Sequence, residues 1–444
     1  MTLLLLNRRP LLDRLAAWFP DCAEELVVVT DPSALGDAGP AAWSGRFRHL
    51  EVVDDYAAPE TGELVERLVR AHAVERILTT AESDVLRAAR LRHRLGLPGQ
   101  TEASALAYRD KHVMKTLAGA AGVPVAPMRM VHAGAELADF ADEHGLPVVV
   151  KAVDGVACLG QRVLTDPTSL REPAGPWPAP LLAEAWIEGD TFHVDGVMAG
   201  GAVLFGRPSR YLNSQWLTHH GSAPLVSGML AADDPLFARL QRAVRDVVRA
   251  LPAPEGACAF HAEFFRTADD RIVLCEIACR AGGGSIVEAF ELATGVNLHG
   301  ASLLGQAGRT ADLPRPGTVV RHGYATWYPP VETATLRRLP QHCPLPGTVK
   351  YVPSGRVGHR YHGPDSPSHR VADLFFRLPD DGPDDGPGDR LVGGPGSTTD
   401  GVLGSTPGDR LTDRLREVDR WWAGAARWDF GNAAEAPVDG PGPA

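Results

Sequence analysis

The sequence predicts an α/β protein with α+β parts: a parallel α/β domain, a central domain of strands and helices, and a β-rich C-terminal region. Strand and helix patterns alternate over residues 1–108, which indicates a small parallel sheet. A hairpin of long strands lies within residues 109–307, and short strands separated by proline and glycine follow in residues 308–444. With 444 residues, 44% of them hydrophobic, the chain can form about two to four domains.

In the N-terminal domain, the patterns predict strands over residues 3–6, 26–30 and 76–80 and helices over residues 10–19, 62–73 and 84–96. Ligands often bind where the strands of such a sheet end and the helices begin. Glu82 lies between the last strand and the last helix, so it is a candidate substrate residue. A helix cap by Ser83 or Asp84 would explain the same stretch without a ligand.

A predicted β-hairpin places two carboxylates side by side. Its turn at residues 269–270 would pair Thr267 with Ile272, and the same register would set Glu263 opposite Glu276. Like charges about 4 Å apart repel by about 4 kcal/mol at an effective dielectric near 20. A divalent cation would offset this repulsion, and carboxylate oxygens suit Mg²⁺ better than zinc.

The hairpin face that carries the two glutamates also carries further candidate site residues. Because side chains alternate along a strand, His261, Ala278 and Arg280 are expected on the face of the two glutamates. His261 is a candidate catalytic residue, although a structural histidine with hydrogen-bond partners would fit equally well. A surface hairpin without a metal is the alternative for the whole segment, but its apolar residues favour a buried strand.

Two lysines occupy positions where an anion is expected. Asp110 can cap a helix that ends near Gly122, and this places Lys111 beside the positive helix end. A solvated lysine would explain that pattern as well. Lys151 lies in a predicted buried strand, where lysine is rare without a partner.

A glycine loop and a polar bend follow these lysines. Gly155 and Gly160 delimit a short loop whose backbone amides can cover phosphates, although an ordinary turn has the same spacing. A predicted strand that contains Glu184 then enters a polar bend, and such a connection can present backbone groups to a purine.

In this order, the pieces resemble the ATP-grasp superfamily, and most closely its carboxylate–amine ligases, the group with L-amino-acid ligases and peptide ligases of natural-product pathways. The resemblance covers about residues 100–305 and rests on residues 109–115, 148–151, 184–196, 261–263 and 275–284. It implies an ATP-grasp architecture with an N-terminal domain at 1–108, an ATP-grasp domain at 109–307 with a lid at about 123–187 around one helix at 134–144, and a C-terminal domain at 308–444.

The resemblance also implies roles for single residues. Lys111, Lys151 and the loop between Gly155 and Gly160 would bind phosphates, and Glu184 and Ile187 would bind adenine. Glu263 and Glu276 would bind Mg²⁺. Arg280 would stabilise charge on the transferring phosphoryl group. One or two Mg²⁺ ions, with Mn²⁺ as a substitute, are expected. Three departures stand out: Ala278 replaces a usual metal-binding asparagine, Thr191 replaces a ribose-binding glutamate, and the glycine loop lacks serines. Glu188 or Asp190 would then contact the ribose.

The activity that the resemblance implies is ATP-dependent ligation. A carboxylate attacks the γ-phosphoryl group to give an acyl phosphate and ADP, and an amine then displaces phosphate to form an amide. Three alternatives stay open: transfer of the acyl group to a carrier-protein thiol, a small-molecule kinase on the same fold, and a nucleotide-binding protein without turnover.

Substrate residues are expected in a polar and aromatic loop at residues 207–220. Arg210 could pair with a substrate carboxylate, and His219 or His220 could deprotonate an amine. Gly283 and Gly284 are further candidates after Arg280. The expected substrates are a small carboxylic acid and an amine of the amino-acid type, and a homodimer is left open.

Composition excludes several other classes. The 44 basic and 55 acidic residues give a net charge of −11 without a basic run, so no nucleic-acid partner is expected. Apolar stretches stay below about 18 residues, so no membrane span is predicted. The six cysteines form no paired framework, which favours the cytoplasm. Residues 380–409, rich in Gly, Pro, Asp and Ser, predict a disordered insertion.

Overall fold

The computed structural model describes residues 1–156, 158–171, 180–220, 223–314, 318–363, 369–379 and 410–430. The insertion predicted at residues 380–409 lies outside these ranges. The chain divides into two compact units, of which the larger comprises Met1–Arg210 and Met229–Val320, and the smaller comprises Tyr211–Gly228 and Arg321–Ala444. The predicted domain boundaries near residues 108 and 307 stay predictions.

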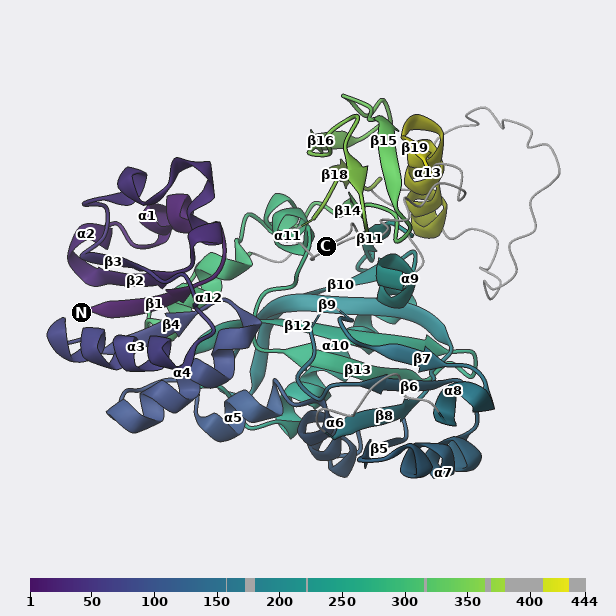
Figure 1. Cartoon of the computed structure of the whole chain (residues 1–444), viewed down its shortest axis with the longest axis horizontal. Coiled ribbons are helices and arrows are strands. Elements are labelled where there is room, and N and C mark those ends of the chain that lie inside the picture. Colours follow the sequence, from purple (N-terminus) through teal and green to yellow (C-terminus); the bar gives the residue numbers. More distant parts are fainter. Residues whose placement is uncertain are drawn as a thin grey trace, which may run out of the picture. The chain divides into compact units, whose positions relative to one another are not determined.

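A four-stranded parallel sheet begins the larger unit (Figure 1). Its strands, in spatial order, are β3 (His49–Val52), β2 (Leu26–Thr30), β1 (Leu3–Asn7) and β4 (Arg76–Thr79). Both faces of β1 and β2 are buried, which explains their continuous runs of leucine and valine. The three predicted strands are confirmed, whereas β3 was missed because it is only half-buried and has no such run.

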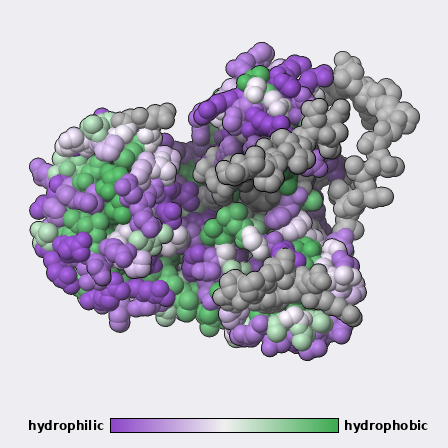
Figure 2. Space-filling model, in the orientation of Figure 1, coloured by the Kyte–Doolittle hydropathy of each residue, from purple (hydrophilic) through white to green (hydrophobic). Residues whose placement is uncertain are grey.

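Helices cover both faces of this sheet. The short helices η1 (Leu12–Arg14), α1 (Leu15–Trp18) and α2 (Cys22–Glu25) pack on one face, and α3 (Pro59–Ala71) and α4 (Glu82–Leu95) pack on the other. The outer side of α3 and α4 is mainly hydrophilic, as the lower-left rim of Figure 2 shows. The helical stretch predicted over residues 10–19 is confirmed over Leu12–Trp18, where a 3-10 turn leads into a short α-helix. The helix ends at Trp18 because Phe19 precedes Pro20, and a residue before proline disfavours helical dihedrals.

An antiparallel sheet with two helices follows α5 (Glu102–Ala107) and α6 (Lys111–Ala120). Its strands are, in order, β5 (Met128–Val131), β8 (Leu181–Ala185), β6 (Val148–Lys151) and β7 (Arg162–Leu164). The predicted helix over residues 134–144 is confirmed as α7 (Gly134–His144). A second helix, α8 (Pro167–Arg171), also packs on this sheet, so the expectation of one helix was wrong.

Four long antiparallel strands form the centre of the larger unit. They are, in order, β13 (Ile272–Ala278), β12 (Ala257–Thr267), β9 (Gly189–Ala199) and β10 (Ala202–Tyr211), and the helices α10 (Pro235–Ala250), α11 (Ile286–Thr294) and α12 (Leu298–Gln306) belong to the same unit. The loop predicted over residues 207–220 was wrong. Gly200 and Gly201, both with positive φ, close a tight turn whose register continues as far as Arg210, so the polar residues before that point lie in a strand.

The β12–β13 hairpin contains a bulge that decides which residues face each other. Arg266, rather than Thr267, pairs with Ile272, so the predicted pairing beside the turn was wrong. A register shift between Glu263 and Phe264 then restores the predicted pairing of Glu263 with Glu276. Without this shift, the register at the turn would place a cysteine opposite Glu263.

The smaller unit is rich in strands, as predicted. One group comprises β11 (Leu225–Met229), β14 (His322–Trp327), β18 (Ala372–Arg377) and β16 (Thr348–Pro353), and a second comprises β17 (Arg360–Tyr361), β15 (Ala334–Arg338) and β19 (Arg427–Asp429). The helices α9 (Gln215–His220) and α13 (Arg410–Ala425) complete the unit. Trp422 of α13 stacks on Trp327 of β14 with ring centroids 4.3 Å apart. Among the described residues, no helix combines the length and apolarity needed to cross a bilayer.

Close packing of α12 on β12 gives the first prediction. A Cβ atom at Gly305 would lie 2.1 Å from the carbonyl oxygen of Ala257, so Gly305→Ala should force a backbone shift. We expect a loss of stability of about 1–3 kcal/mol, measured by thermal unfolding. Gly424→Ala in α13 is the control, since nothing lies within 4 Å of its Cβ position, and this change should stabilise by about 0.5–1 kcal/mol. Equal unfolding temperatures for both variants would contradict the packing described.

Candidate functional site

Two glutamates face each other across the central hairpin, and one of them forms an ion pair with a lysine. Glu263 of β12 lies opposite Glu276 of β13. The Nζ atom of Lys111 lies 3.1 Å from Oε2 of Glu276. Burial acts to raise the pKa of Glu276, but Lys111 and then Lys151 outweigh it and lower this pKa to about 2. Glu276 is therefore an ionised carboxylate with a lysine partner.

Glu263 has a histidine partner on its own strand. Nε2 of His261 lies 3.1 Å from Oε1 of Glu263, and Nδ1 of His261 lies 2.9 Å from Oδ1 of Asp195. Burial alone would lower the pKa of His261, but Asp195 and then Glu263 raise it to about 10. Because both ring nitrogens face carboxylates, both donate hydrogen bonds. The prediction that His261 lies beside Glu263 is confirmed in geometry, and its catalytic role stays a prediction.

A second carboxylate is shared by two buried lysines. Glu184 of β8 accepts from Nζ of Lys151 at 2.7 Å and from Nζ of Lys115 at 2.5 Å. Burial would raise the pKa of Glu184, but Lys115 and Lys151 lower it to about 2. Lys115 was not predicted from the sequence, although its spacing from Lys111 was a usable signal. Four residues along α6 make about one helical turn, which places both lysines on one helix face.

The start of α6 holds the glycine loop through backbone contacts. Asp110 caps the helix as predicted, since its carboxylate accepts from the backbone N–H of Val113 at 2.9 Å. Lys111 donates from Nζ to the carbonyl oxygen of Gly155 at 2.7 Å, and Arg109 donates to that of Asp154 at 2.6 Å. These contacts tie the loop to the start of the helix that carries both lysines. At its far end Gly160 has a φ of +69°, which favours glycine.

Arg280 is oriented by the carboxylate of Glu82, the first residue of α4. Its Nε donates to Oε2 of Glu82 at 2.8 Å, and its Nη2 also donates to this oxygen. Arg109 contacts the other oxygen of Glu82 at 3.5 Å. Burial would raise the pKa of Glu82, but Arg280 and Arg109 lower it. Glu82 was predicted as a substrate residue, and the structure places it as the partner of the predicted catalytic arginine.

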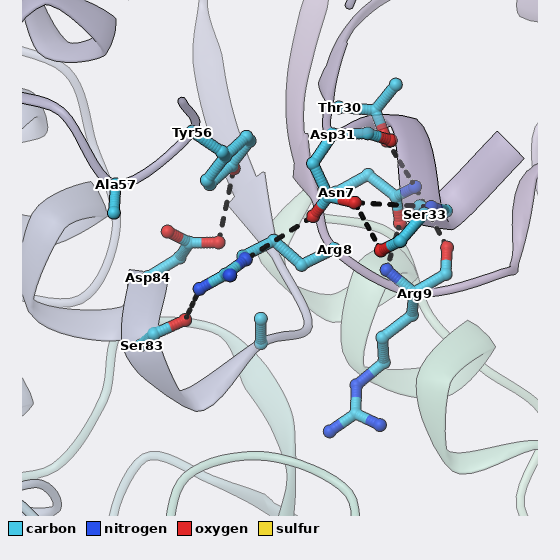
Figure 3. A network of polar contacts seen from close by, with 12 residues as sticks. Asn7, Arg8, Arg9, Thr30, Asp31, Ser33, Tyr56, Ala57, Ser83 and Asp84 are labelled. Carbon is cyan, nitrogen blue, oxygen red and sulfur yellow. Dashed lines mark hydrogen bonds and ion pairs between the residues drawn. The ribbon is translucent and has the colours of Figure 1, made fainter. Parts of the chain in front are cut away.

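A polar network fixes the end of the sheet from which Glu82 extends (Figure 3). Asn7, at the end of β1, donates to the hydroxyl of Thr30 at 3.1 Å. Arg8 donates to the hydroxyl of Ser83 at 3.1 Å. The hydroxyl of Tyr56 donates to Asp84 at 3.2 Å. Because the last two contacts hold the residues directly after Glu82, they orient the first turn of α4.

The remaining predicted residues occupy three places. Ile187 is half-buried and Glu188 is exposed between β8 and β9, and Asp190 forms an ion pair with Arg210 at 3.0 Å. Arg210 thus already has a carboxylate partner on the neighbouring strand. Gly283 and Gly284 lie in the loop between β13 and α11.

The two predicted histidines belong to α9 in the smaller unit. The ring of His220 stacks on Trp216 with centroids 3.7 Å apart, and the side chain of His219 lies outside the described atoms. Both residues lie on a helix, whereas the sequence analysis expected them in a loop.

Comparisons with known proteins agree with this arrangement. The L-arginine-specific L-amino acid ligase of Bacillus subtilis is 27% identical over 311 residues, which cover 64% of this chain and 72% of that protein. The crystal structure of the L-amino acid ligase from Bacillus licheniformis matches 97% of this chain and 99% of its own length, with a TM-score of 0.67 and 15% identity. No family model matches the chain.

A third similar structure contains nucleotide and metal. It is the biotin carboxylase domain of the Hydrogenobacter thermophilus 2-oxoglutarate carboxylase, solved as a dimer with MgADP, ADP and bicarbonate. It covers 85% of this chain and 86% of its own length, with a TM-score of 0.59 and 16% identity. The chain has the ATP-grasp fold. The predicted ATP-grasp architecture and the resemblance to L-amino-acid ligases are thereby confirmed, while the roles of single residues stay predictions.

Within this fold, the shared carboxylate of Glu184 should control acid stability. The pKa of Glu184 in the folded protein, about 2, lies below its ordinary value of 4.5, so its ion pairs stabilise the fold above about pH 4.5. This contribution should be lost as the pH falls from 4.5 towards 2. Glu184→Gln should cost about 3–5 kcal/mol near neutral pH, because Lys115 and Lys151 lose their common partner.

Chemical denaturation at several pH values would measure this effect. The stability of Glu184→Gln should depend less on pH between 4.5 and 2 than that of the wild type. Glu143→Gln is the control, since Glu143 is an exposed residue on α7 that pairs with Arg129, and its pH dependence should match the wild type. Parallel curves for the wild type and Glu184→Gln would show that these ion pairs do not contribute.

Proposed function

We propose that the chain is an ATP-dependent carboxylate–amine ligase that forms an amide or peptide bond through an acyl phosphate and releases ADP and phosphate. One observation carries this proposal: the opposed carboxylates Glu263 and Glu276 lie in one site with Lys111, Lys151 and Arg280. Phosphoryl transfer needs neutralisation of charge and positioning rather than covalent help from side chains, and this set supplies both. The similar L-amino acid ligases support it.

The donor set of the hairpin fits Mg²⁺. Glu263 and Glu276 offer oxygen ligands only, and Mg²⁺ prefers oxygen and commonly binds one or two carboxylates together with phosphates. Bound Mg²⁺ would neutralise charge on the β- and γ-phosphates. Ala278 offers no ligand atom on the same strand. We further propose one or two ions at this site, with Mn²⁺ as a substitute for Mg²⁺.

The lysines and Arg280 would bind different parts of the substrates. Lys111 and Lys151, whose Nζ atoms contact Glu276 and Glu184, would bind phosphate oxygens, and the Gly155 loop that Lys111 anchors would cover them. Arg280 would stabilise the charge that develops on the transferring phosphoryl group and on the acyl phosphate. Glu82 holds the guanidinium in place for this task, which lowers the cost of ordering it during the reaction.

The proposed substrates are a small carboxylic acid and an amine of the amino-acid type. The similar ligase from Bacillus subtilis is named as specific for L-arginine. We propose a reducing compartment such as the cytoplasm, in agreement with six free cysteines, and a role in natural-product biosynthesis.

A screen of amino acids and metabolite acids with ATP and Mg²⁺, read by mass spectrometry and by ADP release, tests the proposal. Formation of an amide with stoichiometric ADP, dependent on both an acid and an amine, is the expected result. A phosphorylated product that forms without an amine would replace it with a kinase. Nucleotide binding with no product from any pair would favour a binding protein.

The metal assignment predicts a large effect on turnover without a loss of the fold. Glu263→Gln removes one of two proposed Mg²⁺ ligands, so the rate of ADP release should fall by about two to four orders of magnitude. The unfolding temperature without Mg²⁺ should not fall much, because the change also relieves repulsion from Glu276. Glu143→Gln, on the exposed side of α7, is the matched control and should keep full activity. Wild-type turnover in Glu263→Gln would refute the assignment.

A further inference from the structure

Four polar side chains form a continuous hydrogen-bonded row that begins at Glu263 and leads away from the site. Glu263 accepts from His261 at 3.1 Å, His261 donates to Asp195 at 2.9 Å, and the other oxygen of Asp195 lies 2.5 Å from Nδ1 of His193. The strand register brings them together, since His261 pairs with Asp195, and Glu263 pairs with His193, across β12 and β9. The row is therefore built into the sheet.

In the contact between Asp195 and His261, both side chains use both of their polar atoms in hydrogen bonds. The carboxylate of Asp195 uses one oxygen for each histidine, and the ring of His261 uses one nitrogen for each carboxylate. The side chains of His193 and Asp195 are 3% and 2% exposed, so solvent does not compete for these contacts. A ring that is held at both nitrogens keeps one orientation, and this orientation fixes the direction from which His261 meets Glu263.

The spacing of the row favours direct hydrogen bonds over a bound transition metal. Ligand atoms of His193, Asp195 and His261 lie within 4.8 Å of one another, as a metal site would require. However, two ligands of a tetrahedral zinc ion, each about 2.0–2.1 Å from it, lie roughly 3.3 Å apart. The separations of 2.5 and 2.9 Å from Asp195 to the histidines are shorter and match hydrogen bonds.

The loop after Arg280 packs onto the same carboxylate. A Cβ atom at Gly282 would lie 2.7 Å from Oδ1 of Asp195, so only glycine lets the loop approach this closely. Gly283 and Gly284 were the residues predicted from the sequence, whereas the close contact is at Gly282. Asp195 thus lies between His261 and the segment that follows the proposed catalytic arginine.

We propose that Asp195 and His193 are positioning residues that act through His261 to aim the carboxylate of Glu263 at Mg²⁺. This inference rests on the proposed function, because Glu263 is a metal ligand only in that proposal. Glu276 has Lys111 as its orienting partner, and Glu263 has the His261 row. Because Ala278, directly across from His261, supplies no ligand atom, the site depends on the orientation of two glutamates.

Titration of Mg²⁺ at a fixed ADP concentration, followed by isothermal calorimetry, tests the inference without any need for turnover. Asp195→Asn keeps the size of the side chain but replaces one of its two acceptor oxygens by a donor. We expect the Mg²⁺ concentration for half-maximal ADP binding to rise about 10- to 100-fold, the range found when partners of metal ligands are removed. ADP affinity at saturating Mg²⁺ should stay within about twofold, which a general loss of structure would not allow.

A double variant asks whether the effect passes through His261. If it does, Asp195→Asn should add little to the shift already caused by His261→Ala, whereas independent effects would multiply and overturn the relay. Met198→Leu is the control, because Met198 is a fully buried residue on the same strand, outside the row. Its Mg²⁺ dependence should equal that of the wild type.

The possible failures can be told apart. If Glu263→Gln shifts the Mg²⁺ dependence and a folded Asp195→Asn does not, the inference fails and the proposed function stands. If Glu263→Gln causes no shift either, the metal assignment itself fails. Should Asp195→Asn not fold, His193→Gln serves instead, since it leaves the contact between Asp195 and His261 in place. Its expected shift is smaller, about threefold to tenfold, and an unchanged Mg²⁺ dependence would overturn the inference.

Discussion

Repulsion between two carboxylates that face each other across a strand pair is the constraint on which the site depends. Glu263 and Glu276 are opposite each other only because a bulge corrects the register between the turn and the glutamates. Each then needs a cation. Lys111 arrives from the first turn of α6, and His261 comes from the strand itself. The first turn of α6 and a histidine of β12 thus supply the positive charge that this register requires.

The same principle extends to the other cations, each of which is held by a carboxylate. Glu184 holds Lys151 and Lys115, and Glu82 holds Arg280. Holding long side chains in place before the reaction avoids the entropy cost of ordering them at the transition state. These carboxylates come from different elements, β8 and the start of α4, so the two sheets and the hairpin must be folded together for the cations to converge.

Local patterns in the sequence were enough for much of this site. The pairing of the two glutamates, the capping role of Asp110 and the buried Lys151 follow from alternation, helix signals and burial. The bulge was not foreseeable, because no glycine or proline marks it. The prediction paired Thr267 with Ile272 and assumed no bulge. These two errors cancel, so the predicted pairing of Glu263 with Glu276 is correct.

Long-range partners escaped the sequence analysis for a different reason. Asp195 and His261 are 66 residues apart, and Glu82 and Arg280 are 198 residues apart, so no local period connects them. The loop predicted over residues 207–220 failed because its polar residues are satisfied within a strand, as the ion pair of Arg210 with Asp190 shows. Polar residues are therefore compatible with a strand when residues on the neighbouring strand supply their partners.

The central claim is that a carboxylate oxygen attacks the γ-phosphoryl group of ATP, and one labelling experiment tests it directly. An acid identified by the product screen is enriched with ¹⁸O in its carboxyl group and incubated with ATP, Mg²⁺ and the amine. An acyl phosphate must transfer one ¹⁸O atom into the released inorganic phosphate when the amine displaces it, and this is the result that the account predicts. Unlabelled phosphate, or label found in AMP, would contradict it.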